Sequence, residues 1–307
     1  MLVVRPARLD EFDALWRLAE ESGPGFTSLP VDETILRDKL SDSVESFAGR
    51  RRGWEKGRYL LMLEQDGEVV GCGAVKAAVG LSKPFFNYRV LQVAQSSVAG
   101  DRRFDMDVLV LVNEYAGCTE VGTLFLSEKG RGSGAGRLLA QSRYLLIASD
   151  RERFAKIILA ELRGVVHKDG HSPFWDNLGE RFFRMGFSQA DHMSGVTDGQ
   201  FILDLMSKYP IYVDLLPAAA RDVIGQCHPD GEPAMRLLEW EGFRKDKVVD
   251  IFDGGPLVSC PRDNVRTISE SRRVRVTTGD VGEEGMNALV STDVWPDFRV
   301  TRTLAIK

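Results

Sequence analysis

The apolar positions of the first fifty residues follow the pattern of a strand and then that of two helices. Val3 and Val4 predict a short strand. Across residues 12–19 the apolar side chains recur every three to four positions, which predicts a helix that Asp10 caps. A second helical pattern covers residues 32–48. The chain therefore opens with a strand followed by two helices.

Apolar runs in the next hundred residues predict strands. Residues 59–64 and 69–79 flank the turn Gln65-Asp66-Gly67-Glu68, which predicts an antiparallel hairpin. The further strands expected are residues 88–93, 121–126 and 157–162. A glycine-rich turn follows the strand at 121–126, and a helix is predicted from that turn to about residue 148.

Helical patterns dominate between residues 174 and 241. One helix is predicted over residues 174–185, with Gly186 as its left-handed C-terminal cap, and another over residues 233–241, closed by Gly242. From residue 248 onward the chain becomes valine-rich and is punctuated by glycine and proline, which predicts strands. The segments VRVTT (274–278) and FRVTRT (298–303) suggest a small C-terminal β unit.

We therefore expect an α/β protein built in three parts, although no low-complexity linker marks the boundaries. A mixed sheet flanked by helices occupies residues 1–200, an α/β extension occupies residues 201–265, and the β-rich unit occupies residues 266–307.

Composition is that of an ordinary soluble globular protein, with 43% hydrophobic and 28% charged residues in a chain of 307. The formal net charge of -5 gives no general attraction for nucleic acid or an anionic membrane surface. No run of 18 apolar residues and no signal-like N-terminus occur, so a cytoplasmic location is expected. The four cysteines are scattered without a CxxC pair, which argues against a zinc ribbon or a disulfide scaffold.

The sequence TLFLSEKGRGSGAGRLL (123–139) carries the clearest chemical signal. A strand enters a turn with the pattern RxxGxG, formed by Arg131, Gly134 and Gly136, with Gly132 between them. Glycines allow successive backbone N–H groups to point into one concavity, and the helix that follows adds its unsatisfied N-terminal donors and the positive end of its dipole. The turn is therefore predicted to bind a phosphate group.

Several interpretations of this turn compete. A Walker P-loop needs Lys followed by Ser or Thr after the last glycine, but Arg137 and Leu138 stand there. A Rossmann fingerprint would need Gly or Ala in place of Arg137, and the preceding strand is not the first of a βαβ series. A glycine-rich turn without a ligand is the simplest alternative. The turn most closely resembles the [Q/R]xxGx[G/A] motif of GCN5-related N-acyltransferases (GNATs). That resemblance implies an acyl-CoA fold in which Leu124 and Leu126 lie against the pantetheine arm.

A more specific resemblance rests on short segments spread in order from the first strand to about residue 275. They are SGPGFTSLP (22–30), AVGL (78–81), NYRV (87–90), TLFL (123–126), RGV (163–165), SPFW (172–175), YPIY (209–212), DVIGQCHP (222–229) and DIFDGGP (250–256). Together they resemble the bacterial arginine N-succinyltransferase family. Beyond about residue 275 the resemblance weakens.

The family resemblance implies a cytoplasmic enzyme of arginine catabolism that transfers succinyl from succinyl-CoA to the α-amine of L-arginine. It also implies that His228 is the proton donor and that Leu124 contacts succinyl-CoA. A side chain that titrates near neutrality can protonate the departing thiolate or relay a proton from the amine. No cysteine has the setting of a nucleophile, so direct transfer in a ternary complex is expected.

Substrate recognition requires acidic and basic partners, because arginine carries a guanidinium and both arginine and succinyl carry carboxylates. Asp253 or Glu161 is expected to pair with the guanidinium, and Arg89 with a carboxylate. No metal is expected: His167 and His171 have the spacing of two zinc ligands on a helix, but Asp169 and Gly170 between them favour a loop.

Two other functions remain open from the sequence. A related succinyltransferase could prefer ornithine or act as one subunit of an assembly, and the choice between a homo-oligomer and a hetero-oligomer is not decided. A non-catalytic acyl-CoA sensor is the alternative of a different class, and His228 favours the enzyme over it.

Overall fold

A mixed sheet runs through the whole computed structural model, which describes residues 1–307 except 24–25, 52, 197–199, 278, 280–284 and 307. Its strands are β1 (Leu2–Pro6), β2 (Arg58–Gln65), β3 (Glu68–Lys76), β4 (Asn87–Ser97), β5 (Arg102–Val112), β6 (Thr119–Leu126), β7 (Ile157–Glu161), β8 (Ile211–Tyr212), β9 (Arg244–Asp250), β10 (Pro256–Pro261), β11 (Met286–Ser291) and β12 (Val300–Ala305). Among the described residues the order is β11-β12-β1-β2-β3-β6-β7-β10-β9-β4-β5-β8. Only β6 and β7 pair in parallel within this part of the chain.

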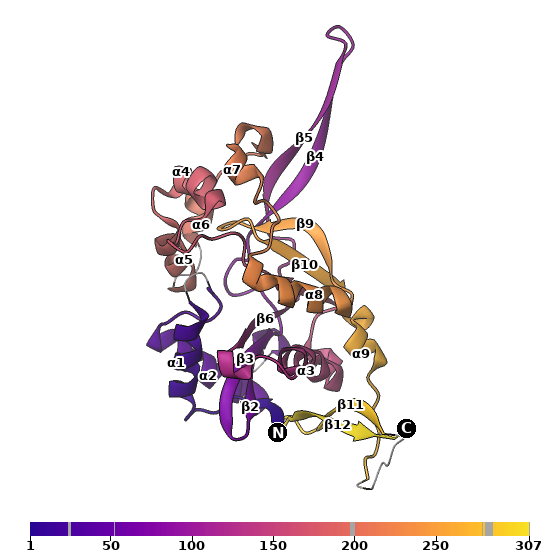
Figure 1. Cartoon of the computed structure of the whole chain (residues 1–307). Coiled ribbons are helices and arrows are strands. Elements are labelled where there is room, and N and C mark those ends of the chain that lie inside the picture. The colour runs from indigo at the N-terminus through magenta and orange to yellow at the C-terminus, as the bar shows by residue number, and fades with distance from the viewer. Residues whose placement is uncertain (24–25, 52, 197–199, 278, 280–284, 307) are drawn as a thin grey trace.

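Helices cover both faces of this sheet (Figure 1). They are α1 (Phe12–Ser22), α2 (Glu33–Phe47), α3 (Ala135–Ser149), α4 (Glu180–Phe183), α5 (Phe187–Val196), α6 (Gln200–Leu205), α7 (Ala218–Arg221), α8 (Glu232–Glu241) and α9 (Arg266–Glu270). The mixed α/β sheet flanked by helices that the sequence predicts is therefore confirmed.

Strand β2 is buried on both faces, which explains its continuous apolar run. Leu60 and Met62 belong to the core shared with α1 and α2, whereas Leu61 and Leu63 belong to the core shared with α3. Successive side chains of a strand point to opposite faces, so a strand covered by helices on both sides needs apolar residues at every position. This two-sided packing makes the centre of the sheet a rigid base for the site.

The first two helices begin in different ways. Asp32, where the second helical pattern starts, caps α2, because its carboxylate accepts a hydrogen bond of 2.9 Å from the amide of Ile35. The prediction for Asp10 was wrong: α1 begins after Glu11, which makes no side-chain cap. The carboxylate of Glu11 instead pairs with the guanidinium of Arg5 and accepts from the amide of Arg8 at 2.8 Å.

The segment predicted as one helix over residues 174–185 is built differently. A π-helical turn (Trp175–Gly179) leads into the short α4, which ends at Arg184 in a left-handed conformation with φ of 56°. The indole of Trp175 donates to the carbonyl of Met185 at 2.9 Å and fixes the chain there. Gly186 is therefore not the cap, and the Gly-Phe pair opens α5 rather than closing a helix.

The C-terminal strands join the main sheet. β12 overlaps the predicted FRVTRT segment and pairs with β1, opposite Val3 and Val4. The prediction for VRVTT was wrong, because residues 274–277 form no strand and residue 278 lies outside the described residues; the partner of β12 is β11 instead. The three-part division of the chain stays a prediction.

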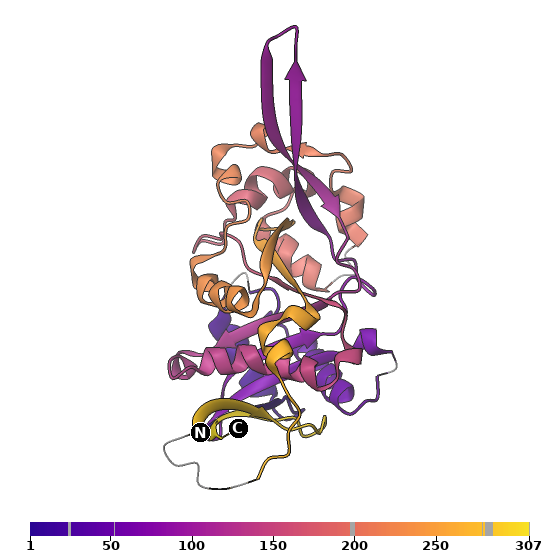
Figure 2. The same ribbon diagram turned by 90° about the vertical axis from the view of Figure 1, so that its right-hand side faces the viewer.

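Strands β4 and β5 form a long antiparallel arm that projects from the body of the molecule (Figures 1 and 2). Its base is held by pairing of Asn87–Arg89 with β9 and of Val108–Leu109 with β8. The sequence pattern predicted part of β4 but not β5. Beyond its base the arm exposes residues 102–105 of β5 in succession, so this half of the strand lacks a buried apolar run.

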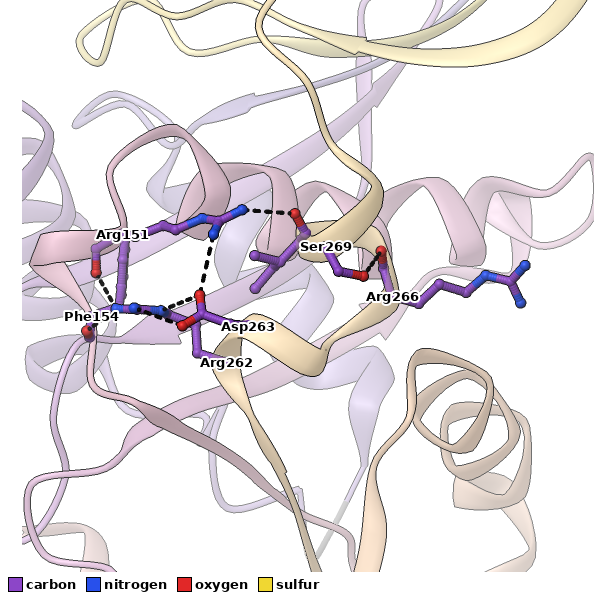
Figure 3. Close-up of polar contacts among 7 residues, drawn as sticks. Arg151, Phe154, Arg262, Asp263, Arg266 and Ser269 are labelled. Atoms are coloured by element: carbon purple, nitrogen blue, oxygen red, sulfur yellow. Dashed lines mark hydrogen bonds and ion pairs between the residues drawn. The ribbon is translucent and has the colours of Figure 1, made fainter.

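Arg262, just after β10, ties the end of the sheet to the connection between α3 and β7. Its guanidinium donates to the carbonyls of Arg151 and Phe154 at 2.6 and 3.0 Å, and Arg151 forms an ion pair with Asp263 at 3.3 Å (Figure 3). Arg151 also donates to the carbonyl of Ile268 in α9 at 3.1 Å. These contacts attach the segment after β10, which leads to the C-terminal hairpin, to the connection between α3 and β7.

Beyond β7, three of the sequence motifs contact one another through their backbones: RGV (163–165), DVIGQCHP (222–229) and DIFDGGP (250–256). The amide of His228 donates to the carbonyl of Arg163 at 2.8 Å, and the amide of Gly225 donates to the carbonyl of Gly254 at 2.8 Å. The backbones approach so closely that a Cβ added at Gly255 would lie 2.2 Å from the carbonyl oxygen of Leu162. Glycine is required there by lack of space.

We expect Gly255→Ala to lower the free energy of unfolding by about 2–3 kcal/mol, because the new methyl group forces apart packed backbone. Gly186→Ala is the matched control, since no atom lies within 4 Å of a Cβ at that position and its φ is not left-handed. Urea unfolding of both variants measures the difference. Equal stability of the two would contradict the packing described for this junction.

Candidate active site

Strand β6 contains a β-bulge directly before the glycine-rich turn. Its pairing with β3 shifts register between Cys72↔Phe125 and Ala74↔Gly122, so that Thr123 and Leu124 together face one residue of β3. Thr123 takes a left-handed conformation with φ of 51°. Bulges bend a strand, increase its twist and re-aim its groups. The bulge turns the second half of β6 away from the regular sheet.

Strands β6 and β7 separate at the same place. Their parallel pairing is limited to Thr119↔Ile158 and Glu120↔Leu159. From Val121 to Leu126, the side of β6 that faces β7 has no strand partner among the described residues. The backbone there can pair with an extended ligand. Leu124 and Leu126, predicted as cofactor contacts, lie on this stretch and pack their partly buried side chains against the core beneath α3.

The turn after β6 presents backbone donors, as predicted. Gly132 and Gly134 have φ values of 95° and 76°, and Gly134 is the N-cap residue of α3. In the described structure the amides of Gly132, Gly134 and Gly136 make no hydrogen bond. Free amides at the start of a fifteen-residue helix are donors of the kind that can bind an anion. Arg131 is exposed beside them.

An acidic cluster lies where β7 leaves β6. The carboxylate of Glu161, the last residue of β7, accepts a hydrogen bond of 2.8 Å from the side-chain amide of Asn87. Glu120 lies nearby on β6 and pairs with Lys76 at 2.7 Å. Burial raises the pKa of Glu161 well above its ordinary value, and the charges of Asp250 and Glu120 raise it further. A cation entering the cluster would be strongly attracted.

Asn87 was not among the residues predicted from the sequence, although it belongs to the NYRV segment. It is only 1% exposed, and its Oδ1 atom is buried without a hydrogen-bond partner in the described structure. A buried carbonyl oxygen without a donor is costly, so it marks a place where a ligand can supply one. The sequence signal that could have identified Asn87 was a polar residue within a partly apolar strand.

The other two predicted substrate residues are occupied elsewhere. Asp253 accepts the amides of Gly164 and Gly255, each at 2.8 Å, so one carboxylate oxygen supports the turn between β9 and β10 and the other joins that turn to the segment after β7. The guanidinium of Arg89 pairs with the carboxylate of Glu114, with Nε 2.8 Å from Oε1. The structure does not bring Arg89 or Asp253 into contact with Glu161.

His228 lies beside the continuation of β7, where its backbone contacts the second residue beyond Glu161. Its amide binds the carbonyl of Arg163, and its Nδ1 atom accepts the amide of Asp230 at 3.2 Å, which leaves the ring proton on Nε2. Burial and the neighbouring Arg163 charge lower the pKa of His228, while Asp230 and the backbone of Val166 oppose this. The side chain is 18% exposed, so the ring is reachable from solvent.

Within the described residues, no group of three or more His, Cys, Asp or Glu side chains is placed to hold a metal ion. His167 and His171 lie in a loop closed by a backbone hydrogen bond of 2.8 Å, as the intervening Asp-Gly predicted. In the same part of the chain, no helix combines the length and the apolar character needed to cross a bilayer.

Comparison with known proteins gives one family. The family model described as "Arginine N-succinyltransferase beta subunit" matches residues 2–267. The curated Arginine N-succinyltransferase of Enterobacter sp. (strain 638) is 42% identical over 301 residues, which cover 97% of this chain and 88% of the relative. The protein of the same name from Escherichia coli O6:H1 is 41% identical over 303 residues, covering 98% and 88%.

A solved structure with the same fold is that of arginine/ornithine succinyltransferase subunit AI from Pseudomonas aeruginosa. It superposes with a TM-score of 0.89 at 35% sequence identity, covering 99% of this chain and 89% of that one. The similarity therefore includes the C-terminal hairpin, where the sequence resemblance weakens. The fold class predicted from the glycine-rich turn is confirmed by this comparison.

The Glu161 cluster predicts a pH-dependent cost in stability. Because its folded-state pKa lies above the ordinary value of 4.5, Glu161 destabilises the fold progressively as pH rises from about 4.5 through the raised pKa. We expect Glu161→Gln to raise Tm at pH 8 by about 2–4 °C, the effect of ~1 kcal/mol in a chain of this size, and to have little effect at pH 4. Calorimetry at both pH values measures it. A lower Tm at pH 8 would contradict the assigned pKa shift.

Proposed function

This chain belongs to the arginine N-succinyltransferase family, and on that basis we propose that it transfers the succinyl group of succinyl-CoA to the α-amine of L-arginine. The chain is an acyltransferase of the GCN5-related N-acyltransferase fold. The observation that carries the proposal is the separation of β6 from β7 at the bulge, with unpaired amides at one end and an acidic cluster and His228 at the other. One donor molecule and one amine can meet across this gap.

The co-substrate is an acyl-CoA, and succinyl-CoA is the one we propose. The free amides of Gly132, Gly134 and Gly136 would hold its diphosphate, with Arg131 beside them. The unpaired side of β6 at Leu124 and Leu126 would pair with the amide groups of pantetheine, as another strand would. The thioester then lies in the gap between β6 and β7. No metal is needed for this arrangement.

The reaction is a direct acyl transfer. The neutral α-amine of arginine attacks the thioester carbonyl and forms an N–C bond, and the C–S bond then breaks and expels the thiolate. The amine loses one proton and the sulfur gains one. A neutral His228, whose pKa is lowered, can take the first proton and deliver it to the sulfur, in keeping with the proton-donor role that the family resemblance implies. Positioning of amine and thioester supplies much of the rate.

Glu161 is the partner that we propose for the positive charge of the amino acid. It lies at the end of β7 with Asn87 bonded to it, and a bound guanidinium would offset the charges that raise its pKa. Asp253 and Arg89 are less suitable, because their hydrogen-bonding atoms already support the β9–β10 turn and Glu114. We assign these two residues a structural role.

A second function is favoured by one observation. The similar Pseudomonas aeruginosa protein is an arginine/ornithine succinyltransferase subunit, so its name places ornithine beside arginine. Ornithine shares the α-amine and carries a terminal ammonium in place of the guanidinium. We also propose an oligomer, because that protein is named as a subunit, and a cytoplasmic location remains our expectation. A non-catalytic acyl-CoA sensor would bind CoA in the same gap without turnover.

An assay of thiol release distinguishes these functions. With a panel of amines and acyl-CoAs, we expect succinyl-CoA with L-arginine to give the highest kcat/KM, because the acidic cluster and the planar guanidinium match in charge and in donor geometry. A higher value with ornithine would select the second function. CoA binding without release of thiol from any pair would select the sensor.

We expect His228→Ala to lower kcat by about 10²–10⁴-fold, the usual contribution of a positioned acid–base group, with little change in the KM for succinyl-CoA. The control is His171→Ala, because His171 is exposed and pairs with Asp176 in a separate loop. Initial rates from pH 6 to 9 should rise with deprotonation of the α-amine in both variants. Full turnover by His228→Ala would remove the histidine from the mechanism.

A further inference from the structure

The C-terminal hairpin places a guanidinium on the glycine-rich turn. Arg302 belongs to β12, which pairs with β11 on one side and with β1 on the other. A Cβ added at Gly134 would lie 2.7 Å from Nη1 of Arg302, 3.2 Å from Nη2 and 3.4 Å from Cζ. The guanidinium therefore lies directly against the N-cap residue of α3. Figures 1 and 2 both show the hairpin beside α3.

Two strand contacts fix the position of Arg302. The neighbouring Thr301 pairs with Val3 of β1, and its hydroxyl donates to the carbonyl of Leu2 at 3.0 Å. On the other side Arg302 is opposite Leu289 of β11. The backbone that carries the guanidinium is thus part of the main sheet, and α3 packs across that sheet.

The surroundings of Arg302 contain donors without a matching acceptor. Its guanidinium is exposed and forms no ion pair or side-chain hydrogen bond in the described structure. The amide of Gly134, against which the guanidinium lies, is also unbonded, as are those of Gly132 and Gly136 in the same turn. A guanidinium offers five N–H donors in a planar fork and no acceptor. A group of donors that converge in this way fits a multiply charged oxyanion.

Arg131 in the turn is exposed like Arg302, whereas two other nearby cations are already engaged. Lys129 pairs with Glu68 at 3.0 Å. Arg137, in the first turn of α3, lies over the ring of Trp240 with Cζ 4.1 Å from the centroid, and Arg266 lies at 4.4 Å from the same ring. Arg302 thus differs from Lys129 and Arg137 in having its charge available to a ligand at Gly134.

We propose that Arg302 binds the diphosphate of coenzyme A, so that the C-terminal hairpin completes the cofactor site begun by the turn after β6. The proposal rests on the proposed use of an acyl-CoA. Backbone amides supply partial charges to the diphosphate, and Arg302 supplies a full charge whose two parallel donors match two phosphate oxygens. The hairpin then has a role in binding as well as in closing the edge of the sheet at β1.

The test is the dissociation constant for CoA, measured by calorimetry with the full chain. We expect Arg302→Ala to raise Kd about tenfold, equivalent to ~1.4 kcal/mol, and Arg302→Lys to raise it less, because lysine keeps the charge but loses the fork. Raised salt should weaken binding more in the native protein than in Arg302→Ala. Arg299→Ala is the matched control: Arg299 lies on the same hairpin and is exposed, but it lines a different pocket with Arg5 and Phe47.

Dephospho-CoA, which keeps the diphosphate but lacks the 3′-phosphate, identifies the group that Arg302 binds. The same factor of loss for CoA and dephospho-CoA supports the diphosphate. Loss with CoA alone overturns this assignment in favour of the 3′-phosphate, and an unchanged Kd with both overturns any phosphate role. Arg302→Lys with native Tm keeps the test valid if Arg302→Ala disturbs the hairpin. Failure of the native protein to bind CoA would contradict the proposed function instead.

Discussion

The separation of two parallel strands is the constraint on which the rest of the structure depends. β6 and β7 pair over only two residues each, and the bulge at Thr123 then turns β6 away. Backbone N–H and C=O groups that would otherwise form hydrogen bonds within the sheet are left without a strand partner on one side of β6. Such an opening is tolerable in a folded protein only if a ligand or solvent can pair with the exposed groups. The glycine-rich turn lies at one end of this opening, and Glu161 and His228 lie at the other.

The two sides of the opening have opposite electrostatic character. At the turn, unbonded amides and Arg302 present donors to an anion. At the end of β7, burial and then the charges of Asp250 and Glu120 raise the pKa of Glu161, so its ionised form costs stability. The fold tolerates this cost because β7 is packed on both faces, with Ile158 and Ala160 in one core cluster and Leu159 in another. Functional sites commonly store such strain, since binding relieves it.

Much of the site could be predicted where its chemistry is local in sequence. The turn Arg131–Gly136 and its position between a strand and a helix follow from residue types alone, and the structure has them as predicted. Failures arose where a side-chain contact from outside the helix decided the outcome. Glu11 rather than Asp10 begins α1 because Arg5 binds it, and Arg184 ends α4 because Trp175 reaches Met185. At a helix end, one such side-chain contact contributes more free energy than the helix propensity of a single residue.

The sequence by itself determined most of the strands and helices, the glycine-rich turn and the family, because these follow from the residue pattern within each segment and from the order of the segments. It could not determine which charged residues face the opening. Asp253 and Glu161 look alike as acidic residues after apolar runs, yet one supports a turn and the other ends a strand beside Asn87. Nor could it place Arg302 at Gly134, since 168 positions of chain separate them. Contacts between distant segments are set by strand order and register, which exist only after the sheet has closed around its cores.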